Sequence, residues 1–83
     1  MKGRVLQIVS QVMQHPVDQI DEHSSPDTIA AWDSLRHMNL VLALEEEFGV
    51  RFSHESIVEM LSVESIISAI AQLVSRQEND SQR

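Results

Sequence analysis

The sequence contains no cysteine among its 83 residues. The chain therefore has no disulfide, no thiolate zinc site and no catalytic thiol of its own, and any thiol chemistry must come from a prosthetic group. Glycine is also scarce, with two residues, and there is no Gly-rich phosphate loop, internal repeat or strand-like alternation. No apolar run is long enough for a membrane span, and the amino terminus lacks the pattern of a signal peptide. We expect one cytoplasmic domain without membrane insertion.

Basic residues are few. Six Lys and Arg stand against thirteen Asp and Glu, which gives a formal net charge of −7. A negative surface repels nucleic acids and anionic membranes, and it favours docking on basic patches of other proteins. We therefore expect a monomer with protein partners and no nucleic acid.

Apolar residues recur at helical spacing in four segments, which predicts an all-α fold, a small four-helix bundle with a long first loop. The expected helices are residues 3–14, a second one that starts at Asp33 or Ser34 and closes at Gly49, a short third one from Ser53 to about Leu61, and a last one after Ser62. In the short helix, Ile57, Met60 and Leu61 should face the core. The domain should comprise residues 1–76, and the polar tail 77–83 should fray.

The segment from Pro16 to Trp32 is polar and reads as a long loop, which is unusual in a small domain and often functional. Val17, Ile20 and Ile29 should hold it to the core, and Trp32 should pack its end against the bundle. A calcium site is not expected, because the EF-hand spacing and its glycine are missing. The acidic residues concerned are Asp18, Asp21, Glu22 and Asp27.

The second helix has two apolar sides. One side is an ordinary core face, formed by Leu40, Val41, Leu44 and Phe48. Leu35, Met38 and Leu42 fall on nearly the opposite side, where an amphipathic helix normally has polar residues. We interpret these three residues as an apolar strip for a partner that binds transiently.

The same helix resembles the recognition helix of acyl carrier proteins over about residues 2–76. The resemblance is carried by the motif Asp33-Ser34-Leu35 and, at the family's spacing, the block Ala43-Leu44-Glu45-Glu46-Glu47-Phe48. It implies that Ser34 is joined through a phosphodiester to 4′-phosphopantetheine from coenzyme A, whose thiol carries an acyl group. Asp33 and Leu35 complete the motif, and Asp33 serves recognition by the modifying enzyme. Without the resemblance, a plain helix cap is the simpler interpretation of Ser34.

A carrier of this kind is not an enzyme, and we expect no catalytic residue and no bound metal. The resemblance implies a phosphopantetheinyl transferase as a partner, followed by acyl-loading, condensing and acyl-transfer enzymes. The candidate partner-binding residues are Leu35, Arg36, Met38, Asn39, Leu42, Glu45, Glu46, Glu47 and Glu59. Arg36 and Asn39 stand where the family often has acidic residues. This departure favours a specialised polyketide-like or lipid pathway over general fatty-acid synthesis.

Three alternatives remain open from the sequence. The first is an aminoacyl or peptidyl carrier of the same design, although such carriers usually lack the acidic block. The second is an unmodified helical adaptor that binds through the apolar strip. The third is a serine hydrolase, which is disfavoured because no Gly-x-Ser-x-Gly elbow or evident triad is present. We expect His37 to be a packed or capping histidine.

Overall fold

The structure is a computed structural model that describes residues 1–81, with side chains described as far as Ser75. Within residues 1–81 the chain forms four α-helices and no strand, so the all-α prediction is confirmed. The elements are α1 (Lys2–Met13), the 3₁₀ turn Val17–Gln19, α2 (Ser34–Phe48), α3 (His54–Glu59) and α4 (Val63–Ser81).

The helix ends follow from local chemistry. Gln14 takes a left-handed conformation (φ 53°) after α1, just before Pro16, and Gly49 does the same (φ 63°) after α2. Such residues turn the chain away from the helix axis. At the start of α3, the Ser53 hydroxyl accepts a hydrogen bond from the Ser56 amide at 3.1 Å. The Ser62 hydroxyl accepts one from the Ser65 amide at 3.1 Å, before α4. The expected serine caps are therefore confirmed.

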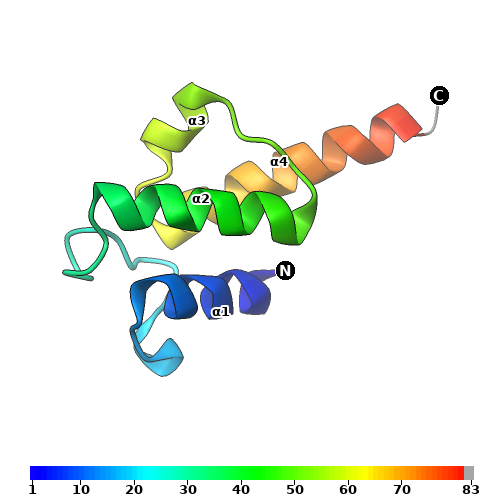
Figure 1. The fold of residues 1–83 in the computed structure, drawn as a ribbon. Helices are drawn as coiled ribbons and strands as arrows, with labels where there is room; N and C mark the ends of the chain where they lie inside the picture. Colours follow the sequence, from blue (N-terminus) through cyan, green and yellow to red (C-terminus); the bar gives the residue numbers. More distant parts are fainter. Residues whose placement is uncertain (82–83) are drawn as a thin grey trace.

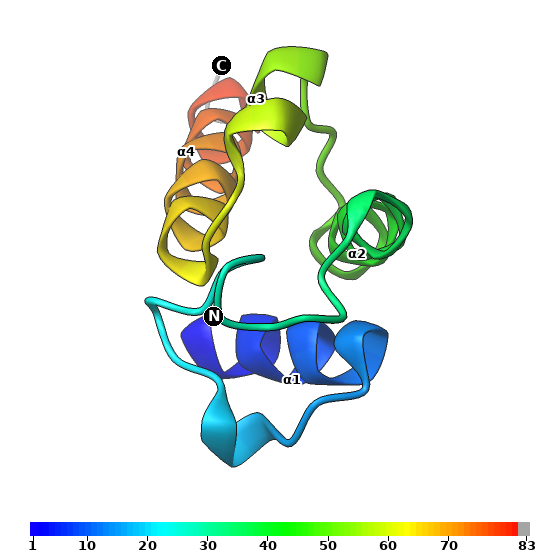
Figure 2. The ribbon, with the colours of Figure 1, turned by 90° about the vertical axis from the view of Figure 1, so that its left-hand side faces the viewer.

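The three long helices surround one apolar core, with α1 in contact with both α2 and α4. Figure 2 shows α1, α2 and α4 around a common centre, with α3 on the side away from α1. In Figure 1, α3 lies on the side of α2 where that helix begins. The core face expected for α2 is confirmed, because Leu40, Val41 and Leu44 are buried and Phe48 packs against the core.

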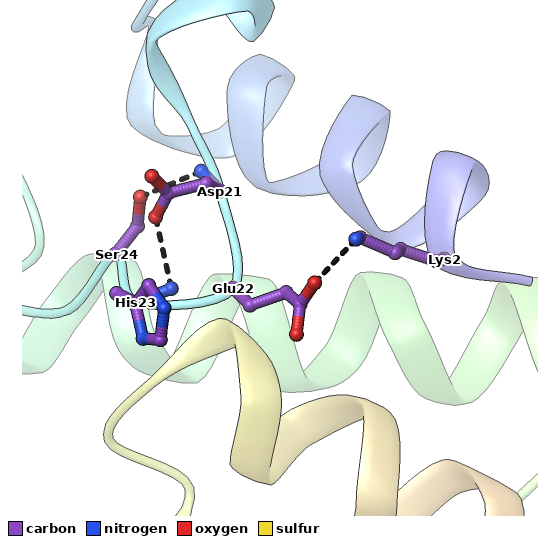
Figure 3. Close-up of polar contacts among 5 residues, drawn as sticks. All are labelled: Lys2, Asp21, Glu22, His23 and Ser24. Atoms are coloured by element: carbon purple, nitrogen blue, oxygen red, sulfur yellow. Dashed lines mark hydrogen bonds and ion pairs between the residues drawn. The ribbon is translucent and has the colours of Figure 1, made fainter.

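The long loop between α1 and α2 is held by its own polar groups. The Asp21 carboxylate accepts from the His23 amide at 2.9 Å, and the hydroxyl of the buried Ser24 accepts from the Asp21 amide at 3.0 Å (Figure 3). Lys2 Nζ donates to Glu22 Oε1 across from α1. These contacts stabilise the turn, as short polar side chains do when they bond to nearby backbone.

The same loop completes the start of α4. The carbonyl oxygens of Glu22 and Ser24 each accept, at 3.0 Å, from the first amides of α4, those of Glu64 and Val63 respectively. The first amides of a helix have no partner inside the helix. The loop therefore supplies two acceptors to the start of α4.

The apolar anchors of the loop are mostly those expected. Ile20, Ile29 and Trp32 are buried, so their predicted role is confirmed. The prediction was wrong for Val17, which is exposed. Val17 is the first residue of the 3₁₀ turn, and its side chain points to solvent. Of the two residues expected to anchor this part of the loop, only Ile20, which follows the turn, is buried.

Two helix ends differ from expectation. Helix α3 stops at Glu59 because Met60 leaves the helical conformation (φ −80°, ψ 66°), and Leu61 then turns outward with 53% of its surface exposed. The inward orientation expected for Leu61 was therefore wrong, whereas Met60 is buried. Helix α4 continues to Ser81. Fraying of the tail stays a prediction, and residues 82–83 lie outside the described part. Of the helices within residues 1–81, none has the combined length and apolar character that a membrane span requires.

Candidate functional site

Ser34 is the first residue of α2, and its side chain is exposed. The cap of this helix is its neighbour Asp33, whose Oδ1 accepts from the Arg36 amide at 2.9 Å. In the described part of the chain no hydrogen bond engages the Ser34 hydroxyl. The capping interpretation of Ser34 is therefore contradicted, because a carboxylate already accepts the amide that a capping serine would bind.

Two apolar pockets flank Ser34, each with a volume of about 310 Å³. Ser34, His37 and Leu61 line both of them. The first pocket is completed by Pro26, Trp32 and Asp33, and the second by Met38, His54, Ile57 and Val58. An exposed hydroxyl beside apolar hollows fits a covalent group that is part polar and part aliphatic.

The apolar strip on α2 is exposed as expected. The exposed fractions are 72% for Leu35, 45% for Met38 and 59% for Leu42. On α3 and just after it, Val58 and Leu61 are also exposed, at 58% and 53%. The spacing of apolar residues in the sequence does not predict that these two are exposed. Val58 lies beside the inward-facing Ile57 in a helix of six residues, which is too short for a reliable periodicity.

Arg36 and Asn39 differ in what they contact. Arg36 is half-buried, and its Nη1 donates to the carbonyl oxygen of Val12 at 2.8 Å. A cation at the carboxyl end of α1 also complements the helix dipole there. Asn39 is exposed, one turn further along α2. The Arg36 side chain therefore joins α2 to α1, a contact that the spacing of residues in the sequence does not predict.

The acidic candidates do not form one surface. Glu45 Oε2 accepts from the Phe52 amide at 2.9 Å, which holds the link between α2 and α3. Glu47 pairs with Arg4 Nη2 at 2.9 Å, and this hydrogen bond lowers the pKa of Glu47 and raises the pKa of Arg4. Glu46 and Glu59 are exposed. Residues 45–47 lie roughly 17 to 20 Å along the helix from Ser34, from the rise per residue.

His37 is a packed histidine, as expected. Its Nδ1 accepts from Trp32 Nε1 at 3.0 Å, its Nε2 lies 2.8 Å from the Ile57 carbonyl oxygen, and its ring stacks with the indole at a centroid distance of 6.2 Å. Both ring nitrogens are therefore occupied, and His37 is not placed to act as a base for Ser34. Among the described residues, no three His, Asp or Glu side chains gather to hold a metal ion.

Comparison with known proteins gives a consistent result. The family description "Phosphopantetheine attachment site" matches residues 3–70. "Acyl carrier protein 3" of Ralstonia nicotianae (strain ATCC BAA-1114 / GMI1000) is 30% identical over 74 residues, which is 88% of this chain and 85% of that protein. The solution structure of holo acyl carrier protein from Geobacter metallireducens has the same fold, with a TM-score of 0.83 and 24% identity over 94% of this chain and 90% of that one. The chain therefore belongs to the acyl carrier proteins, the family with a phosphopantetheine attachment site, and its prosthetic group is a covalently attached 4′-phosphopantetheine.

Proposed function

We propose that Ser34 is the attachment residue and that the domain carries acyl groups between enzymes of a specialised polyketide-like or lipid pathway in the cytoplasm. The observation that supports this most strongly is the division of tasks between two adjacent residues. Asp33 caps α2, and Ser34 is left exposed with its hydroxyl unbonded. A modifying enzyme can thus use the Ser34 oxygen without removing a contact that the fold needs.

The surroundings of Ser34 suit the polar and apolar parts of the group. The positive end of the α2 dipole favours a phosphodiester at the first helical residue. The Asp33 carboxylate opposes that effect at short range, but one of its oxygens is held by the Arg36 amide. The two apolar pockets offer places for aliphatic segments. When bound, the group supplies a thiol that holds an acyl chain as a thioester, which a chain without cysteine cannot provide.

The proposed partners are a phosphopantetheinyl transferase and then acyl-loading, condensing and acyl-transfer enzymes. Leu35, Met38 and Leu42 supply apolar contact beside Ser34, and delivery to several enzymes requires interfaces that release quickly. Asn39, Glu46 and Glu59 are exposed polar contributors. The other three candidates, Arg36, Glu45 and Glu47, already have contacts within the chain. Their role in partner binding must therefore be separated from their role in stability.

The proposal of a specialised pathway depends on the surface near Ser34. Arg36 and Asn39 stand on the first two turns of α2 in place of acidic residues, and the exposed side chains next to them, Leu35 and Met38, are apolar. An enzyme that docks through a basic patch would find no acidic side chain on these two turns. A loading assay that offers acyl and aminoacyl donors to the modified protein tests the cargo. Acylation supports the proposal, and charging by the aminoacyl donor alone would identify an aminoacyl carrier instead.

The attachment residue is tested by intact mass spectrometry after incubation with coenzyme A and a broad-specificity phosphopantetheinyl transferase. We expect one phosphopantetheine group on the wild type and none on Ser34→Ala. Ser68→Ala, which removes an exposed serine from α4, is the matched control and should be modified as the wild type is. Modification of Ser34→Ala, or a wild type that stays bare beside a control carrier that is modified, would overturn the proposal.

A further inference from the structure

His37 connects two segments that are distant in sequence, at the position where α2 begins. On one side it accepts from the indole of Trp32, the buried residue that ends the long loop. On the other side it meets the carbonyl oxygen of Ile57, in the middle of α3. Within the described residues this imidazole is thus a bridge between the loop, α2 and α3.

The bridge specifies one protonation state of the ring. The indole N–H of Trp32 is only a donor, so His37 Nδ1 must be the unprotonated acceptor. Nε2 then carries the hydrogen and donates to the Ile57 carbonyl. A doubly protonated ring would direct an N–H from Nδ1 at the indole N–H, and the bond to Trp32 would be lost. The bridge therefore exists only while the imidazole is neutral.

Helix α3 has few other contacts to hold it. It has six residues, and none of their side chains is fully buried. Its other supports in the described part include the Ser53 cap, the half-buried Ile57 that packs against the core, and the bond from the Phe52 amide to Glu45. The residues Phe52 before it and Met60 after it are buried. Short helices with few buried contacts open at low free-energy cost. The hydrogen bond to the Ile57 carbonyl is therefore one of a small number of contacts that determine where α3 lies.

The position of α3 decides the shape of both pockets beside Ser34. His37 and Leu61 line the two pockets, and Ile57, Val58 and His54 line the second. We propose that His37 is a positioning residue for the prosthetic group: by joining Trp32 to α3, it fixes the two apolar pockets against which a group attached at Ser34 rests. This inference depends on the proposed attachment at Ser34.

Two other titratable groups line these pockets. Asp33 belongs to the cap of α2, with its carboxylate bonded to the Arg36 amide, and His54 is the first residue of α3. No charged side chain of α1, and none of the long loop, lines either pocket. A pH effect on the bridge must therefore be distinguished from titration of Asp33 and His54. Variants at position 37 make that distinction.

His37→Gln and His37→Leu form a matched pair. Glutamine has an amide oxygen that can accept from Trp32 and an amide N–H that can donate to Ile57, and it does not titrate. Leucine retains apolar bulk but makes neither bond. Both variants keep Asp33 and His54, so a pH effect that arises from those residues should persist in His37→Gln.

The test compares amide NMR spectra of the unmodified and the phosphopantetheine-bearing protein, with intact mass confirming modification. At neutral pH we expect the attached group to shift the Val58 and Leu61 amides in the wild type and in His37→Gln, and this shift to be lost in His37→Leu. The wild type should lose it at an acidic pH at which its ring nitrogen shifts show His37 protonated, whereas His37→Gln should keep it.

The inference is overturned if a folded His37→Leu protein keeps the wild-type shifts, or if the wild type keeps them with His37 protonated. The second comparison needs no substitution, so it decides the matter even if His37→Leu does not fold. Failure of the proposed attachment has a different signature. In that case the wild type gains no mass, and no modified sample exists to compare.

Discussion

At the scale of residues, the start of α2 assigns helix capping and the proposed attachment to two different side chains, Asp33 and Ser34. Asp33 accepts the Arg36 amide and leaves the Ser34 hydroxyl exposed. A serine at the cap position would need its oxygen for the helix, and its modification would then cost stability. The order Asp-Ser, rather than Ser alone, is what makes the oxygen accessible to an enzyme.

Substitution of Asp33 should separate capping from enzyme recognition. Asp33→Ala removes the acceptor of the Arg36 amide and should lower the unfolding free energy by about 0.5 to 2 kcal/mol. Asp33→Asn keeps an acceptor and removes the charge, so its stability should stay close to that of the wild type. Chemical denaturation measures the first effect, and the rate of phosphopantetheine transfer measures recognition. If Asp33→Asn is as unstable as Asp33→Ala, the hydrogen bond is not the source of the stability.

At the scale of elements, α2 has three kinds of surface. One side packs into the core, and Arg36 and Glu45 join the helix to α1 and to the link before α3. The side with Leu35, Met38 and Leu42 has no partner within the described chain and is exposed. Exposed apolar side chains that gather beside a reactive position indicate a binding surface more strongly than isolated ones do.

Replacement of Leu42 by serine should affect partner binding and leave the fold intact. The side chain is 59% exposed, so we expect the unfolding free energy to change by no more than about 0.5 kcal/mol. The KM for a partner enzyme that contacts the strip should rise, because apolar contact area is lost. Val17→Ser, an exposed valine outside the strip, is the control and should leave KM unchanged. Equal effects of the two substitutions would contradict a specific role for the strip.

At the scale of the whole molecule, acidic residues outnumber basic ones. In the described part, two ion pairs link elements around the core. Lys2–Glu22 links α1 to the loop, and Arg4–Glu47 links α1 to α2. The hydrogen bond from Lys2 lowers the pKa of Glu22, as the one from Arg4 lowers the pKa of Glu47. Both pairs are solvent-exposed, so salt should screen them and each should contribute little.

These directions predict the pH dependence of stability. A carboxylate whose pKa is lowered by folding stabilises the protein above its ordinary pKa, and this contribution is lost as the pH falls through the folded-state value. We expect the thermal midpoint to fall on acidification, and to fall less in Glu22→Gln/Glu47→Gln, where neither group titrates. Thermal unfolding across the acidic range at low and high salt measures this. An unchanged pH slope in the double variant would show that other carboxylates are responsible.

The sequence by itself determined the helices, the serine caps of α3 and α4, the core side of α2 and the exposed strip, as well as the motif around Ser34. These features depend on neighbours within a turn or two, where periodicity and side-chain capping act. Where that local information ended, prediction failed. Leu61 lies beyond the last turn of α3, and Val17 lies in a turn of three residues, so neither had a helical face to assign it to the core.

Only the tertiary structure decided what Arg36, His37, Glu45 and Glu47 contact. Their distant partners are Val12, Ile57, Phe52 and Arg4, which lie between 7 and 43 positions away in the sequence. From the sequence, a charged or titratable side chain is predicted to be solvent-exposed. The fold can bring a distant carbonyl, amide or guanidinium within hydrogen-bond range of it. The local order of residues is therefore enough to mark Ser34 as the proposed attachment residue. The pockets beside Ser34 form where the loop, α2 and α3 pack together. Such packing cannot be predicted from the local sequence pattern.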